Sequence, residues 1–334
     1  MRDWTATATA TATARVPAAD TAAHRAGRLG VAAMLAALVV LLSAVPAMAA
    51  PIVAVVHTGL GVGQAIVLGL VEGITEYLPI SSTGHLLVTS RLLDLPHSGK
   101  AGDALKSYEI AIQSGAIVAV LGLYRHRFTT MIEGITKKSI AGRELLMGLA
   151  IAFVPAAVVG LVGEKVIKKH LFGVGPVIGA WAVGGVLILV LVARGLLTKP
   201  GGRPLEALTS REAAIIGIAQ VAALWPGTSR SLVTIVAALL LGLSMSAAIE
   251  FSFLLGVLTL GAATAYSVVK DGSAMVDSFG LLTPLIGLVV AFGAAVVSVR
   301  WMVTYLQKHS LAIFGWYRIG VAAIALVLLA TNVI

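Results

Sequence analysis

Residues 69–85 have the sequence GLVEGITEYLPISSTGH, which places Glu72, Glu76 and His85 inside an otherwise apolar region. Ionisable side chains are costly within a bilayer unless they line a water-filled cavity or have partners, so they are candidates for function there. Pro79 and the hydroxyl residues after it interrupt the apolar pattern in the middle of the stretch. The stretch therefore predicts a broken membrane helix that carries a functional site.

The composition indicates an integral membrane protein. The chain has 334 residues, of which 58% are hydrophobic and 12% charged, and its mean hydropathy is +0.99. An ordinary soluble domain is roughly 45–50% apolar and about 25% charged. The net charge is +9, but the basic residues lie in short loops without interleaved aromatic residues, so no nucleic-acid partner is expected. The chain contains no cysteine, which excludes disulfides and cysteine-based metal sites.

The first fifty residues differ in kind from the rest. Threonine and alanine alternate over residues 5–14, a composition typical of disorder. Two arginines, an apolar run over residues 29–45 and Ala-Met-Ala at 47–49 then follow in the order of an export signal. We predict a cleaved signal peptide or an uncleaved signal anchor within residues 1–50. Residues 51–334 are predicted to form one membrane-embedded domain.

Six apolar stretches predict membrane-spanning helices, because each has close to the roughly 20 residues that a crossing requires. They lie near residues 107–124, 144–164, 174–197, 246–269, 279–301 and 311–333. Two further apolar regions, 61–93 and 212–242, are interrupted at Pro79 and Pro226 by proline and polar residues. Each of these two regions predicts a pair of half-helices that enters and leaves the membrane on the same side.

The basic residues of the loops support this topology. Residues 125–143 and 194–211 are rich in arginine and lysine, which predicts cytoplasmic loops, whereas residues 270–278 carry one lysine against two aspartates. If the chain starts outside and crosses the membrane six times, the same loops are cytoplasmic only when both interrupted regions are re-entrant. Residues 165–169, a predicted external loop with three lysines, are the exception.

The two interrupted regions resemble each other at an offset of about 148 residues. The pattern Gly-x-x-Glu before Pro79 is matched by Gly-x-x-Gln before Pro226, and a Ser/Thr cluster follows both prolines. Three full spans lie between them, which inverts the second copy. We predict an all-α polytopic membrane protein built as an inverted repeat, with halves at about residues 59–200 and 207–334. The site is expected between the two interruptions.

The paired carboxylates need a partner. Glu72 and Glu76 are four residues apart and share one helix face, where like charges destabilise each other. A cation, a shared proton or water would relieve this repulsion. Arg230 is one candidate cation, and a divalent metal ion, Mg²⁺ or Ca²⁺, is the other. A polar helix contact without chemistry is the alternative interpretation.

Hydroxyl residues follow both interruptions and surround Arg230 in the second. Helix N-termini bind anions, phosphate above all, and a guanidinium group matches phosphate oxygens with two parallel donors. His85 can exchange a proton near neutral pH. An anion cradle, a hydroxyl nucleophile and acid–base groups together indicate phosphoryl transfer or hydrolysis on a membrane-held substrate.

Residues 72–85 and 226–231 closely resemble the two signature motifs of the undecaprenyl-diphosphate phosphatase family, the bacitracin-resistance proteins. The resemblance continues through residues 108–116, 250–255 and 309–318 and covers roughly residues 59 to 330. It implies removal of the terminal phosphate of undecaprenyl diphosphate, which recycles the lipid carrier for cell-wall synthesis and confers bacitracin resistance. It also implies an inverted-repeat fold in the bacterial plasma membrane with an active site that faces the outer side.

The resemblance implies roles for individual residues. By motif position the catalytic residues would be Glu72, Glu76, Ser82, His85 and Arg230. The residues expected to hold the diphosphate are Ser81, Thr83, Ser229, Arg230 and Thr234. In one hypothesis Glu76 or His85 activates Ser82 for attack on phosphorus. In the other, Glu72 and Glu76 bind Mg²⁺ or Ca²⁺, which activates water.

Alternatives of other classes stay open from the sequence. Inverted repeats with broken helices are common in transporters, so a flippase for polyprenyl phosphates is one alternative, and a catalytically silent relative is another. The family usually has glycine and proline where this chain has Leu232 and Leu258. Gly69 and Gly73 permit close helix contact within one chain or between the two chains of a homodimer.

Overall fold

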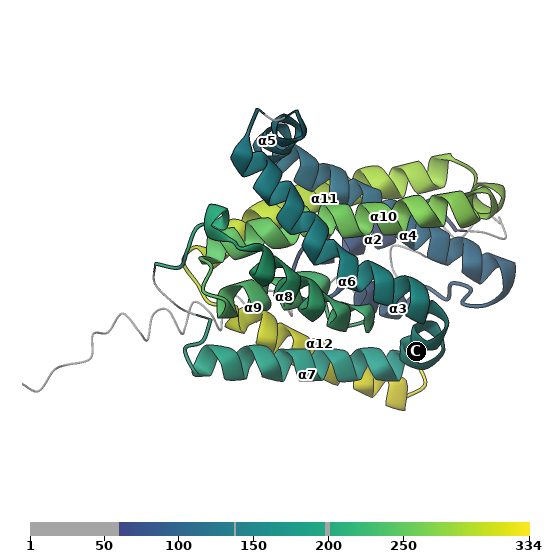
Figure 1. Ribbon diagram of the computed structural model, residues 1–334. Helices are drawn as coiled ribbons and strands as arrows, with labels where there is room; N and C mark the ends of the chain where they lie inside the picture. Colours follow the sequence, from purple (N-terminus) through teal and green to yellow (C-terminus); the bar gives the residue numbers. More distant parts are fainter. Residues whose placement is uncertain (1–59, 137, 198–200) are drawn as a thin grey trace, which may run out of the picture.

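The computed structural model describes residues 60–334 apart from residues 137 and 198–200, so the predicted signal segment at 1–50 lies outside the described residues. The described part is an all-α protein (Figure 1). Its α-helices are α2 (Val62–Thr75), α3 (Ser82–Leu92), α4 (Gly99–Leu123), α5 (Arg125–Ile135), α6 (Ile140–Leu171), α7 (Val174–Ala193), α8 (Ser210–Gln220), α9 (Arg230–Leu240), α10 (Met245–Phe279), α11 (Leu282–Leu306) and α12 (Ala312–Ala330). Two short 3₁₀ helices, η1 (Leu205–Ala207) and η2 (Val221–Leu224), flank α8.

Six of the described helices are long and apolar enough to cross a membrane, and each overlaps one predicted span. They are α4, α6, α7, α10, α11 and α12. The chain is therefore a multi-pass membrane protein. Two predicted loops are wrong in extent, because α6 continues to Leu171 and α10 to Phe279. Glycine follows each actual end within two residues, and Gly280 has φ 67°, a backbone angle that favours glycine.

Both interrupted regions form two short α-helices joined by a segment that is not α-helical, which in the second region begins with η2. We call residues 76–81, between α2 and α3, the first break, and residues 221–229, between α8 and α9, the second break. The four helices have 14, 11, 11 and 11 residues, well below the roughly 20 needed to span a bilayer. Each break ends at a serine with φ 74°, Ser81 in the first and Ser229 in the second. This backbone is rare for residues other than glycine and often marks functional sites.

The helices pack in pairs that surround the two breaks (Figure 1). The short helix α2 packs against α11, and α8 packs against α6, while α4 pairs with α10 and α7 with α12. A Cβ atom at Gly69 or Gly73 would collide with the α11 backbone at Gly287 or Ala291. The small-residue motif of α2 therefore serves contact within the chain, and a homodimer stays a prediction.

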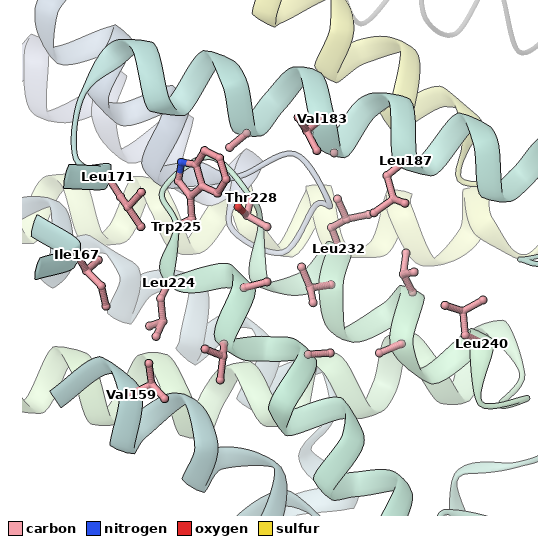
Figure 2. A pocket seen from close by; sticks show the side chains of 18 residues that line it. Val159, Ile167, Leu171, Val183, Leu187, Leu224, Trp225, Thr228, Leu232 and Leu240 are labelled. Atoms are coloured by element: carbon pink, nitrogen blue, oxygen red, sulfur yellow. The ribbon is translucent and has the colours of Figure 1, made fainter. Parts of the chain in front are cut away.

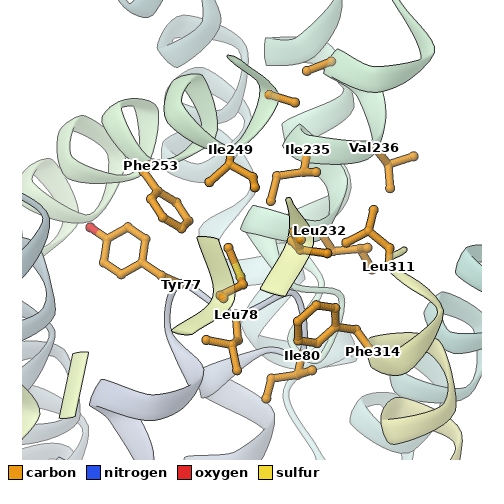
Figure 3. Close-up of a cluster of buried hydrophobic side chains, with 14 of the residues drawn as sticks. Tyr77, Leu78, Ile80, Leu232, Ile235, Val236, Ile249, Phe253, Leu311 and Phe314 are labelled. Carbon is orange, nitrogen blue, oxygen red and sulfur yellow. The ribbon is translucent and has the colours of Figure 1, made fainter. Parts of the chain in front are cut away.

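Apolar side chains of the first break anchor it in the core (Figure 3). Tyr77, Leu78 and Ile80 are all at most 2% exposed and belong to one buried cluster with Leu232 of α9 and Phe314 of α12. Because such cores are close-packed, the polar side chains between these anchors have little freedom to move.

An ion-pair network ties α5 to distant elements. Arg127 contacts Glu250 of α10 at 2.6 Å and Glu206 of η1 at 2.7 Å. Hydrogen bonding from Arg127 holds the pKa of the Glu206 carboxyl below its usual range. Arg127 lies in the first predicted cytoplasmic loop, part of which forms the ordered helix α5.

Candidate active site

Three of the predicted site residues meet where the two breaks face each other. The hydroxyl of Ser82, the first residue of α3, donates a hydrogen bond to the carboxylate of Glu76. Arg230, the first residue of α9, places Nη2 3.5 Å from Oε1 of the same carboxylate. Glu76 and Ser82 are buried. One buried carboxylate thus accepts a hydrogen bond from a hydroxyl in one half of the chain and faces a guanidinium from the other half.

Arg230 is fixed by its surroundings yet keeps unused donors. Its Nη1 donates to the Ser252 carbonyl at 2.8 Å, and its guanidinium carbon lies 5.5 Å from the centroid of the Tyr77 ring. Its Nε atom is buried and has no hydrogen-bond partner among the described residues, and its buried Nη2 atom has only the Glu76 carboxylate at 3.5 Å. Buried donors without partners are costly, so these two nitrogens are suited to a bound anion.

A polar cavity of about 160 Å³ lies over these residues. Its polar lining comes from both breaks and from α3, α4, α8, α9 and α10: Glu76, Ser81, Ser82, Thr83, Gln113, Gln220, Ser229, Arg230 and Thr259. Two helices, α3 and α9, begin at this cavity. Their free N–H groups and positive dipole ends favour an anion there, as the arginine does.

His85 lies outside the cavity lining, and both of its ring nitrogens are occupied. Its Nδ1 lies 2.6 Å from the Ser81 carbonyl, and its Nε2 lies 2.9 Å from the Tyr317 hydroxyl. Because a carbonyl can only accept, Nδ1 carries a proton, which leaves Nε2 as the acceptor of the neutral ring. The ring also contacts those of Trp181 and Tyr317, with centroids 4.9 and 5.7 Å away.

Two other predicted residues lie behind the cavity. Both carboxylate oxygens of Glu72 are buried without a hydrogen-bond partner among the described residues. Thr234 lies one turn after Arg230 in α9, where its hydroxyl donates to the Arg230 carbonyl at 2.9 Å and lies 2.6 Å from the Ser252 hydroxyl. Since Ser252 also accepts from Arg230, Thr234 supports the arginine and does not line the cavity.

The four carbonyls of residues 78–81 each accept a hydrogen bond from a side chain. Leu78 accepts from Ser231 at 3.0 Å, Ile80 from Trp181 at 2.9 Å, and Ser81 from His85. Arg318 of α12 approaches Pro79 at 3.5 Å. Side chains from α3, α7, α9 and α12 thereby replace the helical hydrogen bonds that the first break lacks.

Sequence reasoning missed the role of Arg318. This arginine is fully buried and also donates to the carbonyls of Ala180, at 2.8 Å, and Gly227, at 2.9 Å. It therefore joins both breaks and α7. The signal available in the sequence was an arginine within the apolar run of residues 311–333.

Sequence reasoning also left two amides out of the site. Gln113 and Gln220 line the polar cavity, and the side-chain amide atoms of Gln220 are buried without partners among the described residues. Gln220 occupies the repeat position that corresponds to Glu72. This correspondence was the signal in the sequence that could have identified Gln220. A buried amide with no partner in a polar cavity is suited to bind a ligand.

The fold and the site define a class: a multi-pass membrane protein with a hydroxyl, a carboxylate and an arginine at a polar cavity. The chain belongs to the family described as Bacitracin resistance protein BacA, whose sequence profile matches residues 65–324.

Curated relatives cover most of the chain. It is 44% identical over 265 residues to the undecaprenyl-diphosphatase of Sorangium cellulosum, which covers 79% of this chain and 85% of the relative. It is 42% identical over 274 residues to the undecaprenyl-diphosphatase of Methylibium petroleiphilum, covering 79% and 93%. It is 44% identical over 269 residues to undecaprenyl-diphosphatase 2 of Rhodospirillum rubrum, covering 80% and 94%.

Proposed function

We propose that this protein hydrolyses undecaprenyl diphosphate to undecaprenyl phosphate and inorganic phosphate, and thereby confers bacitracin resistance. The observation that carries the proposal is the set of Ser82, Glu76 and Arg230 in one buried polar cavity. The names of the relatives and the family description agree with it. The substrate partner is a polyprenyl diphosphate lipid in the bilayer.

The contacts favour a two-step phosphoryl transfer. Glu76 accepts the proton of Ser82 while Oγ bonds to the terminal phosphorus and the bridging P–O bond breaks, which releases undecaprenyl phosphate. Water then attacks the phosphoserine and gives inorganic phosphate and free Ser82. Arg230 and the N–H groups at the starts of α3 and α9 stabilise the charge that develops on the transferred group. Ser81, Thr83 and Ser229 offer hydroxyls at the same cavity.

Glu72 and Glu76 are the residues that would hold a divalent cation, Mg²⁺ or Ca²⁺. The two unpartnered, buried oxygens of Glu72 fit this assignment, although no group of three or more metal-ligating side chains occurs in the described part of the chain. The cation would supply positive charge for phosphate binding. We expect chelation with EDTA to lower phosphate release at least tenfold and added Mg²⁺ or Ca²⁺ to restore it. Unchanged release after chelation would contradict this assignment and leave a shared proton between the glutamates.

We propose that His85 positions the first break and does not exchange protons during turnover. Both ring nitrogens are already bonded, and neither bond leads to Ser82 or Glu76. Substitution His85→Gln is expected to lower kcat about tenfold or more while the shape of the pH profile of kcat is unchanged. Loss of one limb of that profile would show that His85 acts as an acid or base.

Gln220 is proposed to bind the diphosphate. The substitution Gln220→Leu removes both amide atoms at similar volume, and we expect KM for the lipid to rise about tenfold because a hydrogen bond to a charged group contributes about 1.5 kcal/mol. Gln64→Leu on α2 is the matched control, since the Gln64 amide bonds the Gly61 and Leu93 backbone away from the cavity. Equal KM values for the two variants would contradict the role of Gln220.

We further propose that the two halves form an inverted repeat with two re-entrant hairpins and a site open to the outer side. Ser81 and Ser229 share a φ of 74° at an offset of 229 − 81 = 148 residues, which is the offset of the sequence motifs. In such a repeat α8 corresponds to α2 and α6 to α11, so the α8–α6 contact in one pair matches the α2–α11 contact in the other. Cysteine labelling with a membrane-impermeant reagent at residues 96 and 172, expected outside, and 126 and 308, expected inside, tests the orientation.

The experiment that tests the function measures phosphate release from purified protein in detergent against a panel of prenyl diphosphates. We expect release from undecaprenyl diphosphate and its loss in Arg230→Ala. Absent release combined with movement of lipid phosphate across liposomes would support a flippase instead. Absence of both would indicate a catalytically silent relative.

A further inference from the structure

A second, apolar cavity adjoins the polar one. It has a volume of about 680 Å³ and is bounded by α6, α7, the second break and α9 (Figure 2). Val183 and Leu187 of α7 face Val236 and Leu240 of α9 across it. Val183 is 64% exposed and Leu240 47%, so this groove opens on the outside of the helix bundle. In a membrane-embedded chain that surface faces lipid hydrocarbon.

The lining of the groove is suited to hydrocarbon. Among the side chains that line it, only those of Trp225 and Thr228 carry a polar atom (Figure 2). The indole nitrogen of Trp225 already donates to the Pro176 carbonyl at 3.1 Å. A polar ligand would therefore find almost no partners in the groove, whereas an apolar chain loses nothing by entering it.

The groove lies next to the polar cavity. Leu224 and Trp225, in the middle of the second break, line both. A molecule whose charged end lies beside Arg230 and whose tail passes these two side chains would lie along α9. This arrangement fits an amphiphile with a phosphate head and a hydrocarbon tail.

We infer that the groove between α7 and α9 binds the first isoprenyl units of the lipid substrate, with Leu224 and Trp225 at the junction of diphosphate and tail. The inference rests on the proposed function. The polar cavity accounts for the diphosphate only, and the groove gives the prenyl tail its binding site. The volume lies in the range of roughly 300–1,000 Å³ that is typical of ligand pockets. The groove therefore holds only the start of a long prenyl chain, and the remainder extends into the bilayer.

Two valines of α7 provide a matched test. Val183 lines the groove, whereas Val186, one turn further, is 53% exposed and does not line it. The substitution Val183→Trp fills the groove, and we expect it to raise KM for undecaprenyl diphosphate about tenfold, equivalent to about 1.4 kcal/mol. KM for methyl diphosphate, which has no isoprenyl unit, is expected to be unchanged, and Val186→Trp is expected to leave both KM values unchanged. Equal effects on both substrates, or equal effects of both variants, would overturn the inference.

A second test uses the unaltered protein, so its result does not depend on whether the tryptophan variants fold. Undecaprenyl diphosphate with a diazirine in its first isoprenyl unit is expected to label residues of α7 and α9 on illumination, and unlabelled substrate should compete. Labelling elsewhere, or labelling by a diazirine phospholipid that the substrate does not displace, would identify the groove as an ordinary lipid contact. Failure of the proposed function is distinguishable, because it abolishes phosphate release from methyl diphosphate as well.

Discussion

The substitution Ser82→Ala is expected to reduce phosphate release from undecaprenyl diphosphate by about 10³-fold or more, with KM changed little. The Ser82 hydroxyl donates a hydrogen bond to Glu76 at the edge of the cavity, so it is the hydroxyl placed to attack phosphorus. Loss of a nucleophile removes nearly all of the catalysis that depends on it. Initial rates of phosphate release at saturating lipid measure the effect.

Controls separate this loss from damage to α3. Ser90→Ala removes a second buried hydroxyl of the same helix, which bonds only the Leu87 carbonyl, and should keep activity. Glu76→Gln should also lose about 10²–10⁴-fold, because it removes the proton acceptor. Phosphoserine at residue 82 should be trapped by rapid acid quench during wild-type turnover. Full turnover by Ser82→Ala would exclude the two-step mechanism and favour direct attack by water.

The substitution Arg318→Gln is expected to cost about 3 kcal/mol or more of stability and most of the activity. Arg318 donates to the Ala180 and Gly227 carbonyls and approaches that of Pro79, all in the interior. Each buried carbonyl left without a donor costs about 1–3 kcal/mol. The loss should appear as a lower midpoint of thermal unfolding in detergent, followed by tryptophan fluorescence.

Arg300→Gln is the matched control, because Arg300 lies exposed on the neighbouring helix α11. It should leave both the midpoint and the activity unchanged. Arg318→Lys keeps the charge but cannot reach three separate carbonyls with one ammonium group, so an intermediate loss is expected. Wild-type stability and activity of Arg318→Gln would show that the breaks do not depend on this residue.

Local patterns in the sequence were sufficient for much of the fold. Each of the six candidate spanning helices is a continuous apolar run, and hydropathy depends only on the residues within such a run. The interruptions at Pro79 and Pro226 were equally visible, since proline removes a backbone donor and ends a helix nearby. The ends of α6 and α10 were misplaced because polar residues continue a helix wherever no residue terminates it.

The sequence by itself determined the membrane class, the two breaks and the identity of most polar residues near them. Only the tertiary structure decided which of these residues meet. It brings Glu76 and Arg230, 154 positions apart, into one cavity, and turns His85 towards Tyr317 and away from Ser82. It also reveals Arg318 as the link between the breaks and places an apolar groove beside the polar cavity. The physical reason is that helix formation follows from neighbours along the chain, whereas hydrogen-bond partners in a buried site come from helices distant in sequence.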